Sequence, residues 1–329
     1  MPAETDTDLH FQVNTADAGE HLDRLVARAA QVSRRVARTW IATGRVSVGN
    51  KPLRILTKPM RAGLEISIRR TAADAEPRAA TAAPVATGRP TGSSPETLRV
   101  LFVDRYLLVL DKPARLLTEQ DRFGSPAVES IAPTLLAKMG ERGGRTRVWL
   151  VHRLDAGTSG VVVLARTPMA AKALGEAFRT GTVHKTYFAL CKGRFVGTRT
   201  LDAAIARAER TRHVVSAAGK PARTLLVGVA ATEVASLVRA EPETGRTHQI
   251  RVHLTHLGHP LLGDGLYGGP MYTQSAEPQP IGRPMLHAAR IVFPHPKTGA
   301  PTEFRVAPPA DFATLAAALA LDLPVDEGR

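Results

Sequence analysis

The apolar positions near the start of the chain recur at helical spacing. One set, at i, i+3, i+4 and i+7, predicts a helix with a single apolar face: Leu22, Leu25, Val26 and Ala29. A second helix is predicted to begin at Ser33, whose side chain can cap it, and to end at Gly44. Its inner face comprises Ala37, Trp40 and Ile41. A strand over 45–48 and a turn at Gly49-Asn50 are predicted to follow.

The pattern changes from about residue 98, where short apolar runs predict strands. These runs occupy 100–103, 107–110, 148–151, 161–165, 185–190, 225–229 and 286–293. Helical spacing returns over 169–178, briefly around 250–257, and in the tail at 312–323. Strands outnumber helices and do not alternate with them as a doubly wound sheet requires. The predicted fold class is therefore α+β, with a mixed, mainly antiparallel sheet.

Residues 71–97 separate these two patterns. Of these 27 residues, 21 are Ala, Pro, Thr, Gly or Ser, and Val85 is the one large aliphatic side chain. Such a composition cannot form a core, so we predict a flexible linker between two domains.

Charge and composition narrow the class of protein. The formal charge is +14, and the segment 17–70 carries 12 Lys or Arg against 4 Asp or Glu, which favours an acidic partner such as nucleic acid. The single cysteine, Cys191, excludes a disulfide within the chain and lies in an apolar run where it can pack as a small hydrophobe. No apolar stretch of 18 residues occurs, and the first residues are acidic rather than signal-like, so we expect a cytoplasmic protein without a membrane span.

The stretch from Val151 to Gly160 is the most informative in the chain. It places an arginine, a carboxylate and a small-residue turn between two apolar runs that predict buried strands. Burying charged groups is costly, so a charged pair on such a tight loop indicates a functional site. Written HRLDxxTSG, the loop resembles the signature of the RluA-type pseudouridine synthases, and the resemblance implies that Asp155 is the essential catalytic residue.

The resemblance extends over most of the second segment in several blocks that occur in the family's order. They are Leu110–Pro113 (LDKP), His184–Tyr187 (HKTY), Thr244–His253 (TGRTHQIRVH), His259–Asp264 (HPLLGD) and Leu286–Ala288 (LHA). It implies an enzyme that isomerises a uridine within RNA to pseudouridine, without cofactor or metal. One block alone could arise by chance, whereas an ordered series could hardly do so.

The resemblance also implies roles for further residues. A carboxylate such as Asp155 can attack the anomeric carbon, take a proton from the neighbouring sugar carbon, or stabilise an oxocarbenium-like state, and the sequence does not choose among these. Arg251 is the first choice for the cation that pairs with Asp155, and Arg246 is the alternative. Tyr187 is expected to stack on the target uracil.

Other residues of the same blocks are expected to bind the substrate. Arg153 is predicted to fill the space left when the nucleotide leaves its stack, or else to bind a phosphate. His152 is expected to shape the loop through a hydrogen bond rather than to transfer protons. Thr158, Arg246 and His248 complete this substrate-binding group.

The first segment resembles the small S-four-type RNA-binding domain, through LDxxL and SRxxAxxWIxxGRVxV. The order Gly49-Asn50 departs from the family's usual Asn-Gly and puts the turn geometry in doubt. Four arginines are predicted to form one basic edge for RNA phosphates: Arg34, Arg35, Arg38 and Arg45. The full division is a tail at 1–16, this domain at 17–70, the linker at 71–97, the catalytic domain at 98–310 and a tail at 311–329.

Two patterns with other possible meanings are set aside. Gly263-x-Gly265-x-x-Gly268 matches a dinucleotide fingerprint but lacks the strand-to-helix context, and the histidines at 253, 256 and 259 would spread around a helix rather than hold a metal.

The expected partner is RNA, with large-subunit ribosomal RNA favoured and transfer RNA possible, and a monomer is expected.

The alternatives to this enzyme are a non-catalytic RNA-binding assembly factor and a nucleoside-directed glycosidase. The first would be expected to lose one of Asp155, Tyr187 or Arg251, and the second lacks a convincing second carboxylate. The segments 116–120 and 138–147 depart from the family's pattern and could change the choice of substrate.

Overall fold

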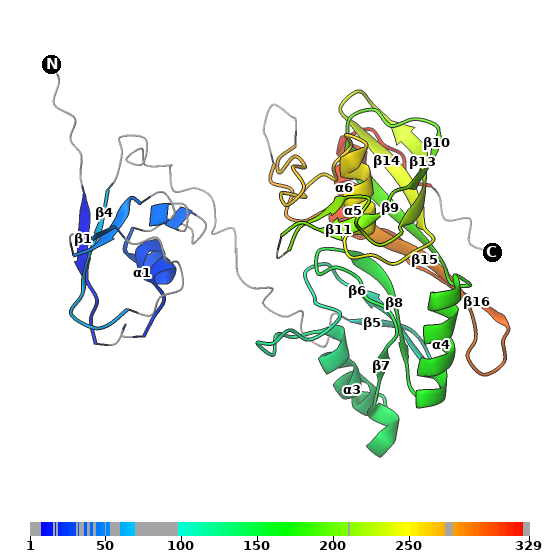
Figure 1. Ribbon diagram of the computed structural model, residues 1–329. Helices are drawn as coiled ribbons and strands as arrows, with labels where there is room; N and C mark the ends of the chain where they lie inside the picture. Colours follow the sequence, from blue (N-terminus) through cyan, green and yellow to red (C-terminus); the bar gives the residue numbers. More distant parts are fainter. Residues whose placement is uncertain are drawn as a thin grey trace. The chain divides into compact units, whose positions relative to one another are not determined.

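The computed structural model describes residues 8–15, 17, 19–30, 32, 36–37, 40–41, 44–49, 51–52, 60–69, 98–209, 211–273 and 279–324. The chain divides into two compact units, Met1–Thr87 and Gly88–Arg329 (Figure 1). The division falls inside 71–97, and this predicted linker lies outside the described residues. Each unit is described by itself.

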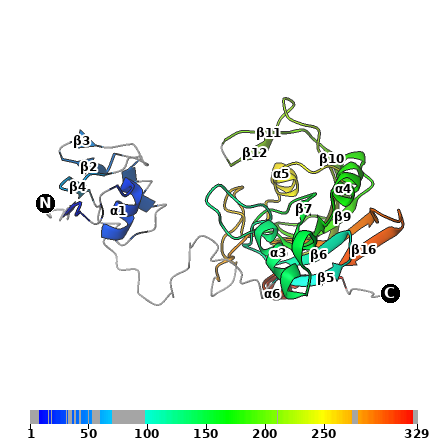
Figure 2. The same ribbon diagram turned by 90° about the horizontal axis from the view of Figure 1, so that it is seen from below.

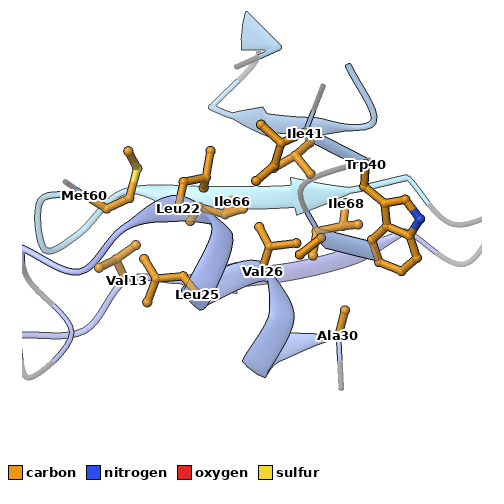
Figure 3. Close-up of a cluster of buried hydrophobic side chains, with 12 residues drawn as sticks. Val13, Leu22, Leu25, Val26, Ala30, Trp40, Ile41, Met60, Ile66 and Ile68 are labelled. Carbon is orange, nitrogen blue, oxygen red and sulfur yellow. The ribbon is translucent and has the colours of Figure 1, made fainter. Parts of the chain in front are cut away.

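The first unit is a small antiparallel sheet with a helix against it. Its strands are β1 (Leu9–Gln12), β2 (Val46–Val48), β3 (Lys51–Pro52) and β4 (Glu65–Ile68), in the order β1-β4-β2-β3. The helix α1 (Leu22–Ala29) turns Leu22, Leu25 and Val26 toward the sheet, where Ile66 and Ile68 complete the core (Figure 3).

The predicted second helix is described only in part. Residues 36–37 and 40–41 are helical, and the three side chains of the predicted inner face, Ala37, Trp40 and Ile41, are buried. Gly44 has the left-handed φ of 74° that suits the end of a helix. Ser33, the predicted cap, lies outside the described residues.

The second unit is built on a ten-stranded sheet, in the order β10-β13-β14-β9-β15-β8-β6-β5, with β16 added to β15 and β7 to β8. The strands are β5 (Arg99–Val103), β6 (Leu107–Lys112), β7 (Trp149–Leu150), β8 (Ser159–Ala165), β9 (His184–Lys192), β10 (Thr198–Asp202), β13 (Arg223–Ala231), β14 (Ala235–Pro242), β15 (Leu286–Pro294) and β16 (Pro301–Arg305). Among the described strands only β8 and β15 pair in parallel. The predicted α+β class with a mainly antiparallel mixed sheet is therefore confirmed. A separate hairpin, β11 (Ile205–Arg207) with β12 (His213–Val215), lies beside α5 (Figure 2).

Helices cover both faces of this sheet. In one half, α3 (Val128–Lys138) and α4 (Pro168–Thr180) pack on opposite faces of β6 and β8, whose successive side chains point to the two sides (Figure 1). In the other half, α5 (Gln249–His256) and α6 (Ala310–Ala318) pack on opposite faces of β9 and β14. A short 3₁₀ turn, η3 (Gly143–Thr146), follows α3. Cys191 is buried in the α5 core, where its pKa is raised to about 12 by burial, as expected of a small packed hydrophobe.

The structure changes the predicted C-terminal boundary. We predict 311–329 to be a tail outside the catalytic domain, yet α6 belongs to the core of the second unit. Phe312, Leu315 and Ala316 form one apolar face at helical spacing and are buried against Leu190 and Leu237 of the sheet. The described part of the unit therefore continues through this helix. Within the described residues, no helix combines the length and apolar character that crossing a membrane requires.

Candidate active site

The segment that follows β6 holds the loop between β7 and β8 in place. Thr118 Oγ1 donates to the carbonyl oxygen of Leu154 at 2.8 Å and accepts the Leu154 N–H at 3.1 Å. The loop closes on itself through the Thr158 N–H, which lies 3.0 Å from the carbonyl oxygen of Asp155. The backbone of Asp155 is thus fixed on both sides, and its side chain has a defined direction.

A buried lysine supports the same loop. Lys112, at the end of β6, is fully buried, and its Nζ donates to the carbonyl oxygens of Pro113, Leu116 and Ala156 at 3.0, 2.8 and 3.4 Å. Burial lowers the pKa of Lys112 to about 7, and the negative charge of Asp155 acts against this lowering. The ammonium ties the chain after β6 to the turn that follows Asp155.

All the residues predicted from the second segment line one cavity of about 450 Å³. They come from the loop before β8, from β9, and from the turn that leads into α5. The eight are His152, Arg153, Asp155, Thr158, Tyr187, Arg246, His248 and Arg251. A cavity of this size is in the range of small-molecule sites and accommodates a nucleotide.

Arg251 is the arginine that contacts Asp155. Its Nη1 lies 3.0 Å from Asp155 Oδ2, while Nε and Nη2 donate to the two carboxylate oxygens of Asp264 at 2.7 and 2.9 Å. Asp264 is only 1% exposed, so Arg251 is held rigidly between two carboxylates. Arg246 instead donates to the carbonyl oxygen of Pro221 at 2.9 Å. Of the two arginines considered, only Arg251 has the position needed for pairing with Asp155.

Tyr187 lies on β9, half-buried between two apolar clusters, with its ring on the cavity wall. Burial raises its pKa, and the charge of Asp155 adds to the effect. The phenol is therefore protonated at any physiological pH, and the ring presents a neutral aromatic face to the cavity. Such a face suits a stacked base.

His152 holds the loop rather than facing the chemistry. Its Nε2 accepts the N–H of Val163 at 2.9 Å, and its ring stacks on Phe178 at 4.9 Å between centroids. Burial lowers the pKa of His152 to about 3, with the charge of Lys185 contributing. The ring is neutral and its Nε2 is occupied, an arrangement that agrees with the predicted role in shaping the loop.

Arg153 points to solvent at the cavity edge and pairs with Glu119, with 3.0 Å between Nη1 and Oε2. Glu119 is one of the residues at which the segment 116–120 departs from the family's pattern. Both side chains are more than half exposed, so this pair is weak and an RNA phosphate can replace the carboxylate.

Two residues that build the site have no predicted role. Asp264 and Tyr267 frame Arg251, whose guanidinium carbon lies 4.9 Å from the centroid of the Tyr267 ring. Both belong to the glycine-rich turn that was set aside as a false dinucleotide fingerprint. A Cβ on Gly263 would lie 1.9 Å from the carbonyl oxygen of Arg283, and its φ is +76°, so a glycine is required there for packing and not for phosphate. An isolated acidic residue on a tight turn was the available signal.

The predicted RNA-binding edge of the first unit is described at one position. Arg45 donates to the carbonyl oxygen of Arg69 at 2.9 and 3.0 Å and lies over the Trp40 ring at 4.9 Å. Arg34, Arg35 and Arg38 lie outside the described residues. This basic edge therefore stays a prediction.

Comparison with known proteins gives a consistent result. A family model described as RNA pseudouridylate synthase matches residues 106–256. Ribosomal large subunit pseudouridine synthase D of Vibrio parahaemolyticus is 31% identical over 323 residues, covering 94% of this chain and 94% of the relative. The synthase of the same name from Xanthomonas campestris is 37% identical over 234 residues, covering 68% of this chain and 70% of the relative. Among solved structures, human RNA pseudouridylate synthase domain containing 4 has a TM-score of 0.56 at 27% identity, covering 69% of this chain and 94% of that one.

Proposed function

The chain belongs to the RNA pseudouridylate synthase family, and we propose that it isomerises a specific uridine of large-subunit ribosomal RNA to pseudouridine, with Asp155 as its catalytic residue. The observation that carries the proposal is the cavity in which Arg251 holds the carboxylate of Asp155 and which Tyr187 also lines. The ribosomal substrate is supported by relatives named as ribosomal large subunit synthases that align over up to 94% of this chain.

The proposed reaction adds and removes nothing overall. The bond between uracil N1 and the anomeric carbon C1′ breaks, the uracil turns, and a bond forms between C5 and C1′. The proton on C5 leaves and a proton is taken up at N1, so the atoms balance without cofactor or metal. The ionised carboxylate of Asp155 either bonds to C1′ and is displaced when C5 bonds to that carbon, or removes a sugar proton and later returns it. In both roles the guanidinium of Arg251, 3.0 Å from Oδ2, holds the carboxylate in place.

The carboxylate has one oxygen available for this chemistry. The Arg251 hydrogen bond reaches Oδ2, and within the described part of the chain no hydrogen bond to Oδ1 is formed. We propose that Oδ1 is the reacting oxygen, because it can approach the sugar without breaking the contact with Arg251. The neutral ring of Tyr187 would hold the freed uracil by stacking, which is worth about 1–3 kcal/mol per base.

Reaching the glycosidic bond requires the nucleotide to leave its stack, at a cost of a few kcal/mol. Arg153 lines the cavity and would act in this step, and its pair with Glu119 would open when RNA arrives. We propose that the first unit, with Arg45 and the neighbouring arginines of the predicted edge, binds RNA and raises its local concentration at the cavity.

Two further properties follow from the proposal. We propose that the enzyme acts as a monomer. We propose that the enzyme acts in the cytoplasm, where its proposed RNA substrate is found. Transfer RNA is the second substrate to be tested.

The experiment is release of tritium from C5 of uracil in ribosomal RNA transcribed with labelled uridine. The intact protein is compared with Asp155→Asn and with Asp322→Asn, which changes an exposed aspartate after α6. We expect the intact protein and Asp322→Asn to release tritium, and a folded Asp155→Asn to release none. Release that survives in Asp155→Asn would overturn the catalytic assignment. Absence of release from both ribosomal and transfer RNA, with RNA binding intact, would favour a non-catalytic RNA-binding protein.

A further inference from the structure

His248 occupies a strained position beside Asp155. It is the residue immediately before α5, with φ 58° and ψ 20°, one of three non-glycine residues with positive φ in the described parts of the chain. Backbone strain of this kind persists where the surrounding structure demands it, and it is common at active sites. Here the strain directs the imidazole into the cavity, with Nε2 lying 3.7 Å from Asp155 Oδ2.

The other ring nitrogen of His248 is occupied by Tyr267. The distance from His248 Nδ1 to Tyr267 Oη is 2.8 Å, and Oη also accepts the backbone N–H of His213 at 3.1 Å. Tyr267 is 5% exposed, so these partners are not exchanged with bulk water. A backbone N–H can only donate, so His213 does not compete for the phenolic proton of Tyr267, and this proton can donate to Nδ1.

This arrangement selects one tautomer of the imidazole. If Nδ1 accepts the phenolic proton, the single hydrogen of the neutral ring is on Nε2. The opposite tautomer would turn the lone pair of Nε2 toward the carboxylate of Asp155, which is repulsive, and would leave the buried phenolic proton without an acceptor among the described residues. Both considerations favour Nε2–H.

The Nε2–H group has no hydrogen-bond acceptor among the described residues. Its separation of 3.7 Å from Asp155 Oδ2 is longer than a hydrogen bond, and Oδ2 is already bound by Arg251 at 3.0 Å. Burial lowers the pKa of His248. The charges of Asp155 and Asp264 act against this lowering and those of Arg251 and His213 add to it, and the pKa stays below the usual histidine value, which favours the neutral ring with one N–H. The result is a donor of fixed orientation, facing the space in which the scissile bond must lie.

We propose that Tyr267 positions His248 so that its Nε2–H donates a hydrogen bond to the O2 carbonyl oxygen of the target uracil. The proposal rests on the proposed function. O2 is attached to the carbon next to N1, and negative charge spreads onto it as the N1–C1′ bond breaks. A donor held in place before the reaction stabilises that charge without reorganisation. His248 is then a catalytic residue, and Tyr267 a positioning residue that acts through it.

The tautomer is measured first, and this measurement does not depend on activity. Long-range ¹H–¹⁵N correlation spectra of histidine-labelled protein report which ring nitrogen carries the proton, and His248→Gln assigns the signal. The intact protein is expected to show the Nε2–H tautomer, and Tyr267→Phe is expected to lose this preference. A His248 signal of the Nδ1–H tautomer or of an imidazolium at pH 7.5 would overturn the proposal even if the enzyme is active.

Single-turnover rates with saturating enzyme then test the catalytic effect. His248→Ala and His248→Asn are expected to slow isomerisation about 10²–10³-fold with unchanged RNA affinity, as for loss of one oxyanion-type donor. Asn suits the left-handed backbone, but its amide is too short to reach the position of Nε2. His248→Gln places an amide N–H close to that position and should recover part of the rate. Equal rates in all three variants and the intact protein would overturn the proposal.

Tyr267 is tested by its dependence on His248. Tyr267→Phe keeps the ring under Arg251 and is expected to slow the reaction about tenfold. In the His248→Gln background the same change should have no further effect, because glutamine needs no tautomer selection. Independent losses in the double variant would show a merely structural role for Tyr267.

The identity of the accepting oxygen is tested in the substrate. RNA with 2-thiouridine at the target offers a poorer acceptor at this position and should react more slowly with the intact protein. His248→Ala should show little of this difference. If His248→Ala instead loses discrimination against a 2′-deoxy target, the donor serves the sugar hydroxyl and the assignment to O2 is wrong. If no RNA reacts with the intact protein, the proposed function fails, while the tautomer measurement still stands.

Discussion

Asp264 holds Arg251 through two hydrogen bonds, from Nε at 2.7 Å and from Nη2 at 2.9 Å. This leaves Nη1 as the nitrogen that reaches Asp155. The planar guanidinium matches a carboxylate at two points, which a lysine ammonium cannot do. The buried aspartate therefore sets the direction from which Arg251 approaches the candidate catalytic carboxylate, and it balances a positive charge that would otherwise be poorly compensated.

Asp264→Asn is expected to lower the single-turnover rate by about 10²-fold or more. Asparagine loses the charge and one of the two acceptor oxygens, so Arg251 is free to rotate away from its position on Asp155. Breaking a buried ion pair costs about 3–5 kcal/mol, and urea unfolding should show a loss of that order. A rate and stability equal to those of the intact protein would contradict this role.

A matched control for that variant is Glu303→Gln. Arg290 donates to Glu303 in the same two-point manner, with Nε at 2.9 Å and Nη2 at 2.7 Å, and Arg305 also donates to this carboxylate, but all three side chains are at least one-third exposed. An exposed pair contributes about 0–1 kcal/mol. The control should therefore change neither rate nor stability by more than a small amount.

Arg246→Ala is expected to weaken RNA binding without slowing the chemical step at saturating enzyme. The side chain lines the cavity and contacts Pro221, not Asp155, so its remaining donors can bind a phosphate. The slope of log affinity against log salt concentration should decrease by about one. Filter binding at several salt concentrations measures this, and an unchanged slope with a slower reaction would instead indicate a catalytic contact.

The residues of the cavity and the pairing of Arg251 with Asp155 were predictable only through the family resemblance. Asp155 and Arg251 are 96 positions apart, and their proximity follows from the packing of α5 against the sheet, which periodicity does not specify. Helix α4 was predictable because Thr167 caps it, Pro168 begins it, and Gly181 follows it with φ 77°. Such local signals are written in the sequence, whereas contacts across the sheet are not.

Helix α3 and the burial of α6 were missed for different reasons. Pro133 lies inside α3 and normally argues against a continuous helix, although Val128, Ile131 and Leu136 still follow the period. The alanine-rich α6 predicts a helix but not its burial, since only the fold places Phe312 against Leu190. In the sequence, Asp264 is a polar residue between two glycines, and no neighbouring residue indicates that it pairs with Arg251.

Gly160→Ala is expected to destabilise the second unit by about 3 kcal/mol or more. The new Cβ would lie 2.1 Å from the carbonyl oxygen of Ala288 on the parallel neighbour β15, and φ is +116°. Gly175→Ala is the control, because it lies within α4 with open space around it, and it should stabilise by about 1 kcal/mol. Urea midpoints of both variants provide the test, and equal effects would contradict it.

Acid should destabilise the protein partly through His152. Burial lowers its pKa to about 3 in the folded state, whereas an unfolded histidine has a pKa near 6.5. Between these values the unfolded state binds more protons, so stability falls as the pH falls, by about 1.4 kcal/mol per unit. His152→Gln, which can still accept the Val163 N–H, should show a smaller loss between pH 6.5 and 4.5. Identical pH profiles of unfolding free energy would exclude this contribution.

Lys112 should make the stability depend on pH in the alkaline range. Burial lowers its pKa to about 7 when folded, against 10.5 when unfolded, so between these values the unfolded state binds more protons. Below pH 7 both states are protonated and the cost of burying the charge is fully present. That cost is relieved as the pH rises, so the stability of the intact protein relative to Lys112→Met should increase by about 1.4 kcal/mol per unit from pH 7 to 10.

The three carbonyl oxygens around Nζ oppose this trend, because an ammonium satisfies all three and a neutral amine has only two hydrogens to donate. Urea unfolding of both proteins at half-unit intervals decides which effect is larger. The hydrogen bonds lost in Lys112→Met shift the difference in unfolding free energy between the two proteins by a constant. Only the slope of this difference against pH is therefore informative. If the Met variant does not fold, Lys112→Gln should give the same slope. A rising difference means that burial dominates and the amine is neutral above pH 7. A flat difference means that the three carbonyl oxygens keep Lys112 charged.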